Sequence, residues 1–527
     1  MENSYSSLIQ LYSTGIVIIL FVSAVIFFYT KKFNFVIKSQ IVIPIFYLSL
    51  IFYIFSVLSL SFLKIQALNY YADHATHLEI MWRFNNNLGL TSLMSEGYHN
   101  NIHWFSAHFT PIIFIAYIPY FYFFPYSETL FILETLYLAS TSIPLFLISK
   151  KYLSINQSYL ISTIFLFYPS IYYINIYGPA YLELAIPLIT WLIYFYEKKH
   201  LKTFFLLLII CLSIREEVSL VISFFGLFII FKKEYFIGSV VFTVSIFYFL
   251  IVFFFIIPYF NGHVFALNSS VYLGWGGDSP FAKIISILKN PLLALQYIEI
   301  TRLGNIVLYL IPLLFSSLLY LPSLLITLPN VIITFLSESI THYSFTLYYL
   351  APSIPFIFYS SIIGINNLKF NNKLKNSVIY SILSASLLST IFFSASPLSI
   401  QFWNNDYKVG NFYTSNYHLS EYIVNQNDIT AREFSKLVPL KSSISTEQHL
   451  LPLFFKSKKM LVYPTIDETT EYILIDTFKK SKSGWDQTFL EFRNNPGKFY
   501  NDLEKNHNWE LLHSKDGIKL YKRKHGT

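Results

Sequence analysis

Charge and cysteine are both scarce in this chain of 527 residues. Only 13% of the residues are Asp, Glu, Lys or Arg, about half the share of an ordinary soluble domain. The single cysteine, Cys211, lies in an apolar run, so no disulfide can form within the chain. Hydrophobic residues make up 54% of the sequence and aromatic residues 20%. This composition excludes a disulfide-stapled secreted domain and favours a membrane protein.

Several motifs with a defined chemistry are also missing. The chain has no G-x-x-x-x-G-K-[ST] phosphate loop, which excludes a P-loop ATPase, and no G-x-S-x-G or C-x-x-C motif. We recognise no cleavable signal peptide, because the first apolar segment, 16–29, is followed by Lys31 and Lys32 without a small-residue cleavage site. No internal repeat is visible.

The charges that are present divide the chain in two. Residues 401–527 hold 33 of the 66 charged residues, and the first 400 residues hold the other 33. The net charge of +8 does not indicate a nucleic-acid partner, because the basic residues come in pairs between apolar segments, where the positive-inside rule predicts them. We therefore expect a membrane-embedded part over 1–397 and a soluble α/β domain over 398–527.

The expected fold is an all-α polytopic membrane protein of about 11–13 transmembrane helices, located in the cell membrane. A spanning helix needs about 20 mostly apolar residues. The segments that meet or approach this length are 10–30, 40–63, 109–125, 127–149, 155–176, 180–197, 202–215, 217–232, 235–258, 304–320, 322–337, 345–366 and 376–397.

Short basic loops predict the orientation. Placing them in the cytoplasm puts the first long loop, 64–108, and the small C-terminal α/β domain on the extracytoplasmic side. One segment conflicts with this scheme, because two spans lie between Lys64 and Lys150 where one is needed. We expect 109–125, which Pro111 and Pro119 interrupt, to be re-entrant or interfacial. The basic loops are 31–32, 150–151, 198–202, 232–233 and 369–375.

The C-terminal domain has short strand patterns and one hairpin signal. Residues 461–463 and 472–476 are expected to be strands, and 489–505 a helix. Strands at 509–512 and 518–522 flank Ser514-Lys-Asp-Gly517, which is typical of a hairpin turn.

The first long loop carries four titratable residues within seven positions: Asp73, His74, His77 and Glu79. On a helix, Asp73 and His77 share one face. Imidazole and carboxylate groups suit a divalent transition metal, so these two residues are the candidate metal ligands. Asp73 is also a candidate general base. An amphipathic juxtamembrane helix with an ordinary solvated face gives the same pattern.

Other charged residues interrupt or border apolar segments, where unpaired charge is costly. Arg215, Glu216 and Glu217 separate two such segments. Glu183 follows Gly178-Pro179 and is either a helix-start carboxylate or functional. Arg302 precedes a span and is either an interface residue or a clamp for a phosphate group.

Two further features fall in the expected outer loops. His99, His103 and His108 add three imidazoles to the first loop. Asn268-Ser-Ser270 is a glycosylation sequon in a later one, which is a weak signal.

Six short segments, in order, resemble the prokaryotic membrane proteins of the domain of unknown function 2079 family. The resemblance covers about residues 65–365. Gly178 and Tyr348 depart from it, because the family tends to have histidine at both positions. The segments are Asp73–Trp82, His108-Phe-Thr-Pro111, Tyr177-Gly-Pro179, Arg215-Glu-Glu217, Leu328-Pro-Asn330 and Tyr348-Tyr349 with Ile354-Pro355.

The family's architecture looks like that of the glycosyltransferase C superfamily. This resemblance implies an enzyme that uses a polyprenyl-phosphate sugar donor at the extracytoplasmic face. Asp73 would then be the base or a metal ligand, and Glu216 or Glu217 a second catalytic acid group. Arg302 would bind the donor phosphate, and Arg215, His108 and Glu183 are the other candidate substrate-binding residues. A transporter or flippase and a non-catalytic membrane scaffold are the alternatives.

Overall fold

The computed structural model describes residues 2–70, 72–92, 102–262, 285–286, 289–290, 292, 300–407, 409, 417–478, 491–492 and 494–524. His99 and the sequon at 268–270 lie outside these residues.

The chain divides into two compact units. The helical unit comprises Met1–Ser59, His108–Ile113 and Ile132–Leu419. The mixed unit comprises Leu60–Ala107, Phe114–Phe131 and Ser420–Thr527. Helices α2 (Ser39–Gln66) and α6 (Ser127–Ser140) belong partly to each.

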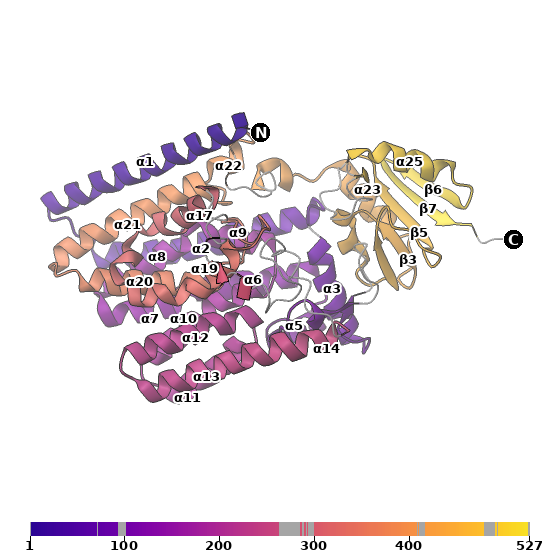
Figure 1. Cartoon of the computed structure of the whole chain (residues 1–527). Helices are drawn as coiled ribbons and strands as arrows, with labels where there is room; N and C mark the ends of the chain where they lie inside the picture. The colour runs from indigo at the N-terminus through magenta and orange to yellow at the C-terminus, as the bar shows by residue number, and fades with distance from the viewer. Residues whose placement is uncertain are drawn as a thin grey trace. The chain divides into compact units, whose positions relative to one another are not determined.

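The helical unit contains helices that pack side by side (Figure 1). Many are short and are separated by brief turns or 3₁₀ segments. Besides α2 and α6, its described helices are α1 (Glu2–Lys32), α7 (Ser142–Tyr152), α8 (Ile155–Leu166), α9 (Pro169–Tyr177), α10 (Ala185–Glu197), α11 (Leu201–Leu212), α12 (Glu216–Phe231), α13 (Tyr235–Ile251), α14 (Ile257–Phe260), α17 (Ile300–Leu310), α18 (Leu321–Leu324), α19 (Leu328–Phe335), α20 (Ile354–Asn367), α21 (Asn372–Phe393) and α22 (Ile400–Trp403), with 3₁₀ segments η2 (Leu182–Leu184), η5 (Ile311–Leu313), η6 (Ser316–Tyr320), η7 (Leu325–Thr327) and η8 (Ala351–Ser353) and the π-helix η3 (Val252–Ile256).

The expected polytopic helical architecture is confirmed. Six helices in the described residues are long and apolar enough to cross a membrane, or seven if the bent pair α8 and α9 is one span. This number is below the expected 11–13, because several apolar segments form helices too short to cross. For example, α10, α11 and α20 have 13, 12 and 14 residues, and a span needs about 20. The segment 109–125 gives two short helices, α4 (Ile113–Ala116) and α5 (Ile118–Phe123).

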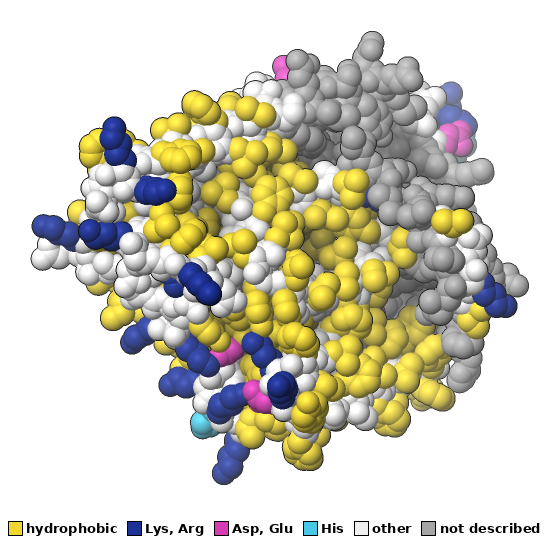
Figure 2. Space-filling model, turned by 60° about the vertical axis from the view of Figure 1, so that its left-hand side comes forward, with side chains coloured by type: hydrophobic (Ala, Val, Ile, Leu, Met, Phe, Trp, Pro, Cys, Tyr) yellow, Lys and Arg dark blue, Asp and Glu magenta, His cyan; other side chains and the backbone are white. Residues whose placement is uncertain are grey.

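The basic loops of the helical unit lie together at one end. Glu197, at the end of α10, accepts hydrogen bonds from Tyr152 and Lys151 at the end of α7 and from Tyr359 on α20. Glu234, just before α13, bonds Lys199 in the same way. Figure 1 shows α12, α13, α20 and α21 reversing direction at this end, and Figure 2 shows Lys and Arg side chains gathered beside a broad hydrophobic surface. This arrangement is what the positive-inside rule requires.

Helices α12 and α13 approach each other closely through two glycines. A Cβ atom on Gly226 would lie 2.6 Å from the backbone nitrogen of Phe242, and one on Gly238 would lie 2.6 Å from that of Ile230. Small residues of this kind let membrane helices pack backbone to backbone. The glycine pair therefore fixes how α12, which carries Glu216 and Glu217, lies against α13.

The mixed unit contains the expected C-terminal sheet. Its five strands have the order β4-β3-β5-β7-β6, with β3 parallel to β4 and β5, and β7 antiparallel to β5 and β6. The buried side chains of β3 and β5 pack against α23 and against Leu68 and Ala75 in one core. The elements are β1 (Thr91–Ser92), β2 (Ile102–His103), β3 (Ser443–Thr446), β4 (Lys459–Val462), β5 (Tyr472–Asp476), β6 (Trp509–Lys515), β7 (Ile518–Arg523), α3 (Ala72–Asn85), α23 (Gln426–Ser435), α25 (Pro496–Lys505), η1 (Trp104–Ser106), η10 (Leu419–Tyr422) and η11 (Gln448–Phe454).

Replacing Gly226 by alanine is expected to destabilise the helical unit, because the new methyl group meets the backbone of α13. Overpacking of this kind costs about 1–3 kcal/mol. Thermal unfolding in detergent, followed by tryptophan fluorescence, measures the effect. Gly304→Ala is the matched control, since no atom of the described residues lies within 4 Å of a Cβ there. Equal unfolding temperatures for the two variants would contradict the close packing of α12 on α13.

Candidate functional site

The turn between α11 and α12 presents three charged side chains in sequence. Arg215 has an extended backbone and caps the start of α12, and Glu216 and Glu217 form its first turn. Carboxylates are favoured there because the helix dipole is positive at the N-terminus. The helix dipole therefore explains why two acidic residues can stand at the start of a helix whose remaining residues are mostly apolar.

A second segment, far away in the sequence, meets this turn. The backbone amide of Ile112 donates a hydrogen bond of 2.9 Å to the carbonyl of Ser213. The backbone amide of Phe109 donates one of 3.1 Å to Glu216 Oε2. These bonds hold the extended stretch that carries His108 against the start of α12.

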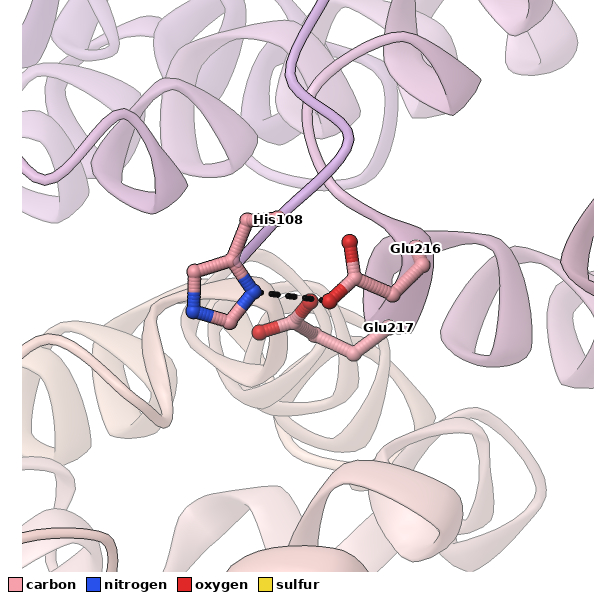
Figure 3. Close-up of side chains that lie close together, drawn as sticks. All are labelled: His108, Glu216 and Glu217. Carbon is pink, nitrogen blue, oxygen red and sulfur yellow. Dashed lines mark hydrogen bonds and ion pairs between the residues drawn. The ribbon is translucent and has the colours of Figure 1, made fainter. Parts of the chain in front are cut away.

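The four side chains form one connected group, whose His108 and glutamate members are drawn in Figure 3. The His108 Nδ1 atom lies 2.8 Å from Glu216 Oε1, and His108 Nε2 lies 3.0 Å from Arg215 Nη2. Arg215 Nη2 also lies 2.7 Å from Glu217 Oε1. Because arginine can only donate, His108 accepts at Nε2 and donates from Nδ1 to Glu216. We call these residues the His108 cluster.

The His108 cluster is largely removed from solvent. Arg215 is 3% exposed and Glu216 7%, whereas the Glu217 and His108 side chains are 17% and 23% exposed. Two polar atoms, Arg215 Nε and Glu217 Oε2, are buried without a hydrogen-bond partner among the described residues. Buried polar atoms are normally paired, so these two atoms are the ones left to bind a ligand.

His342 and two tyrosines border the cluster. Burial, together with the charges of Arg215 and His108, lowers the pKa of His342 to about 4. The His342 ring lies 4.5 Å from the ring of Tyr349, which stacks on Tyr348. His342 is therefore neutral at pH 7. No local sequence pattern connects it to Arg215.

The donor atoms of His108, Glu216 and Glu217 have a spacing that suits a divalent metal. One donor atom from each residue lies within 4.8 Å of the other two. Ligands about 2.1 Å from an octahedral ion are about 3.0 Å apart, close to the His108–Glu216 separation of 2.8 Å. Imidazole with two carboxylates suits a transition metal. The residues fit such an ion.

Arg302 contacts the backbone of another segment of the helical unit. Its guanidinium donates to the carbonyl oxygens of Phe335 and Ser337 and lies 4.3 Å from the ring of Tyr343. It is 4% exposed. Arg302 thus holds the segment that leads to His342. Through this segment it helps to position His342 beside the His108 cluster.

Glu183 lies in a second buried polar group of the helical unit. It is fully buried and accepts a hydrogen bond from the Ala180 amide. Electrostatic interaction couples it to Glu134 on α6, whose two carboxyl oxygens have no hydrogen-bond partner among the described residues. Sequence reasoning missed Glu134 because it treated the charges as lying at the borders of spans. The group also contains Tyr53, Thr135 and Asn175, linked by hydrogen bonds.

Asp73 and His77 belong to the mixed unit and lie on α3, which is helical as their spacing assumed. Asp73 is exposed, whereas His77 is 5% exposed and lies against the ring of Trp104 at 5.0 Å. Glu79, on the same helix, accepts a hydrogen bond of 2.6 Å from Ser92.

A family model described as a predicted membrane protein (DUF2079) matches residues 84–520, which is most of the chain. The match includes every member of the His108 cluster, as well as Glu183 and Arg302. No curated protein matches the chain.

Arg215→Met is expected to destabilise the protein by about 3–5 kcal/mol, because the Glu217 carboxylate, whose side chain is only 17% exposed, loses its cation. The double variant with Glu217→Gln should recover part of this loss. Unfolding in detergent at pH 7 measures both. Lys199→Met is the control, since its ion pair is exposed and should cost at most about 1 kcal/mol. Additive effects of the two cluster substitutions would show that Arg215 and Glu217 do not interact.

Protein stability is expected to fall between about pH 6.5 and pH 4, in part because of His342. In this window the unfolded chain binds a proton at His342 that the folded chain does not bind, so acid favours unfolding. His342→Gln should reduce the slope of unfolding temperature against pH. An unchanged slope would mean that His342 titrates normally in the folded protein.

Proposed function

The chain belongs to the DUF2079 family of predicted membrane proteins, and from that premise we propose that it is a membrane glycosyltransferase. Its donor is a sugar linked to a polyprenyl phosphate in the membrane, and transfer takes place at the extracytoplasmic face. The acceptor is a lipid, glycan or protein hydroxyl group.

The convergence of the His108 cluster carries this proposal. An arginine, a histidine and two glutamates come together inside an apolar helical unit, although His108 and Glu216 are 108 positions apart in the chain. Collecting such groups in a low-dielectric interior is costly unless they are paired or used. Two of their polar atoms have no hydrogen-bond partner among the described residues. The cluster therefore provides a cation for a phosphate and a carboxylate for a proton.

The reaction that suits these groups is a displacement at the anomeric carbon of the sugar. The acceptor oxygen forms a bond to that carbon, and the bond from the carbon to the phosphate oxygen breaks. The hydroxyl proton passes to Glu217 Oε2, and polyprenyl phosphate leaves. The Arg215 guanidinium faces the charge that develops on the leaving phosphate, which is where a fixed cation lowers the barrier.

A divalent metal ion is part of the proposal. His108, Glu216 and Glu217 would hold it, and when bound it would neutralise charge on the donor phosphate. His108 and Glu216 otherwise form a hydrogen-bonded pair that keeps Glu216 in place beside Glu217.

The remaining predicted residues enter the proposal in secondary roles. Asp73 is the alternative base, and with His77 the alternative pair of metal ligands. Arg302 positions the segment of His342 through its bonds to Phe335 and Ser337.

A transporter of lipid-linked or polar solutes is the second candidate, and Glu134 is the observation that favours it. This carboxyl group is fully buried within the candidate span Ser127–Tyr152 and interacts with Glu183. Ionisable residues inside membrane helices often belong to ion-coupled transport pathways.

The test uses purified full-length protein in lipid nanodiscs with a panel of radiolabelled polyprenyl-phosphate sugars and a lipid extract as acceptor. We expect sugar transfer that Glu217→Gln lowers by at least about 100-fold, because a general base contributes that much. Chelation with EDTA should also lower it, and Mn²⁺ should restore it.

Glu468→Gln is the control, because this carboxylate is exposed in the mixed unit and should not affect transfer. Asp73→Asn is tested alongside: loss of transfer there with normal turnover in Glu217→Gln would move the base to α3. Absence of turnover with every donor, in protein that unfolds at its usual temperature, would contradict the glycosyltransferase. Uptake of a labelled solute into proteoliposomes would then favour the transporter.

A further inference from the structure

The mixed unit contains a cavity of about 280 Å³ where helices meet the soluble domain. One wall is formed by the C-terminal end of α2 and by the start of α6, both of which belong to candidate membrane spans. The opposite wall comes from α23 and η11 of the C-terminal domain, and α3 closes one side. The cavity thus lies at the ends of two spans, where a membrane surface would be.

Basic side chains dominate the polar lining of this cavity. They are His74, Arg432, Lys456 and His449, against the single carboxylate of Glu128. His449 is already engaged, since it lies 3.4 Å from Asp476. Asp428 and Glu128 lie within electrostatic range of Arg432, but neither makes an ion pair with it among the described residues. Arg432 and Lys456 therefore provide positive charge that no carboxylate of the described residues contacts directly.

Two of these side chains have buried nitrogen atoms without hydrogen-bond partners. His74 is 4% exposed, and neither of its ring nitrogens has a partner among the described residues. The Arg432 Nε atom also has none, although its Nη2 atom donates to the carbonyl of Ile65. Buried donors of this kind are normally satisfied, so their presence in one cavity points to an acceptor ligand.

The side chains that interact electrostatically with His74 are basic ones, His77 and Lys64. In either protonation state the His74 ring carries at least one N–H donor. A ligand with negative oxygen atoms would pair with that donor and with the nearby cations.

The segment beside the cavity has the features of a membrane-interface anchor. Pro125, Tyr126 and Glu128 line the cavity, and the residues just before them are aromatic and exposed. Aromatic residues gather where the lipid head groups begin. The exposed side chains are Tyr120, Tyr122, Phe123, Phe124 and Tyr126, with exposed fractions from 47% to 72%.

We propose that this cavity binds the phosphate of an anionic phospholipid head group. Arg432, Lys456 and His74 hold the phosphate oxygens. Ile65, Leu68 and Leu453, which also line the cavity, contact the apolar part of the lipid next to the phosphate. The apolar lining and the adjacent aromatic segment favour a lipid over free phosphate as the occupant. This inference does not depend on the proposed glycosyl transfer.

The experiment measures lipid binding to the full-length protein by native mass spectrometry in neutral detergent. The probes are dioleoyl phosphatidic acid, dioleoyl phosphatidylcholine and inorganic phosphate. We expect phosphatidic acid to bind at least about tenfold more tightly than either of the others. Lys456→Gln should weaken it at least about tenfold, since a charged hydrogen bond is lost.

Lys458→Gln is the matched control, because this lysine is exposed two positions away and does not line the cavity. Arg432→Lys is the second cavity variant: it keeps the charge but loses the guanidinium geometry, and the unfolding temperature of each variant shows whether the unit remains folded. The proposal is overturned by equal affinities for phosphatidic acid and phosphatidylcholine. It is also overturned by equal losses in Lys456→Gln and Lys458→Gln. Inorganic phosphate binding as tightly as the lipid would overturn the lipid as the source and assign the cavity to a soluble phosphate ligand.

Discussion

The ion pair between Arg215 and Glu217, at the start of α12, is the interaction on which the arrangement of the helical unit depends. A guanidinium that is 3% exposed within apolar surroundings needs anionic partners, and the first turn of α12 supplies two. One of these carboxylates, that of Glu216, also holds the backbone and side chain of the His108 segment. Burying one charge thus requires three separate features: a helix start, an extended segment and a histidine in a defined tautomer.

Many helices of the helical unit are short, and the breaks between them provide hydrogen-bond partners for polar groups buried in apolar surroundings. Prolines at the start of short helices, such as Pro329 and Pro355, end the preceding segment and turn the chain. Carbonyl groups at the ends of short helices also accept hydrogen bonds from buried donors: those of Phe335, the last residue of α19, and of Ser337 bind Arg302. Short helices and buried polar groups therefore occur together. Because the helices are broken, fewer of them are long enough to cross a membrane. The tight packing of α12 on α13 through Gly226 and Gly238 then holds the charged turn in place.

The mixed unit also buries polar side chains next to apolar ones. Its sheet is completed by a parallel strand, β3, whose four residues are Ser443-Ile-Ser-Thr446 and are all buried. Two of its three hydroxyl side chains bond backbone carbonyls, Ser445 to Thr465 and Thr446 to Leu474, which satisfies these polar groups inside the sheet. The cavity lined by Arg432 and His74 lies next to this core, so basic groups are held beside apolar ones.

The sequence alone determined the features that depend on local composition. Apolar runs predicted the helical body, and paired lysines predicted the loops that gather at one end. Short strand-like runs predicted part of β4 and β5, and a turn signal predicted the hairpin of β6 and β7. It also singled out Arg215, Glu216 and Glu217, because charge between apolar segments is visible locally. Only the tertiary structure brought His108 and His342 to them, placed Arg302 on a neighbouring segment and buried Glu134 with Glu183. Contacts between residues so distant in the chain follow from helix packing, which no pattern within one segment encodes.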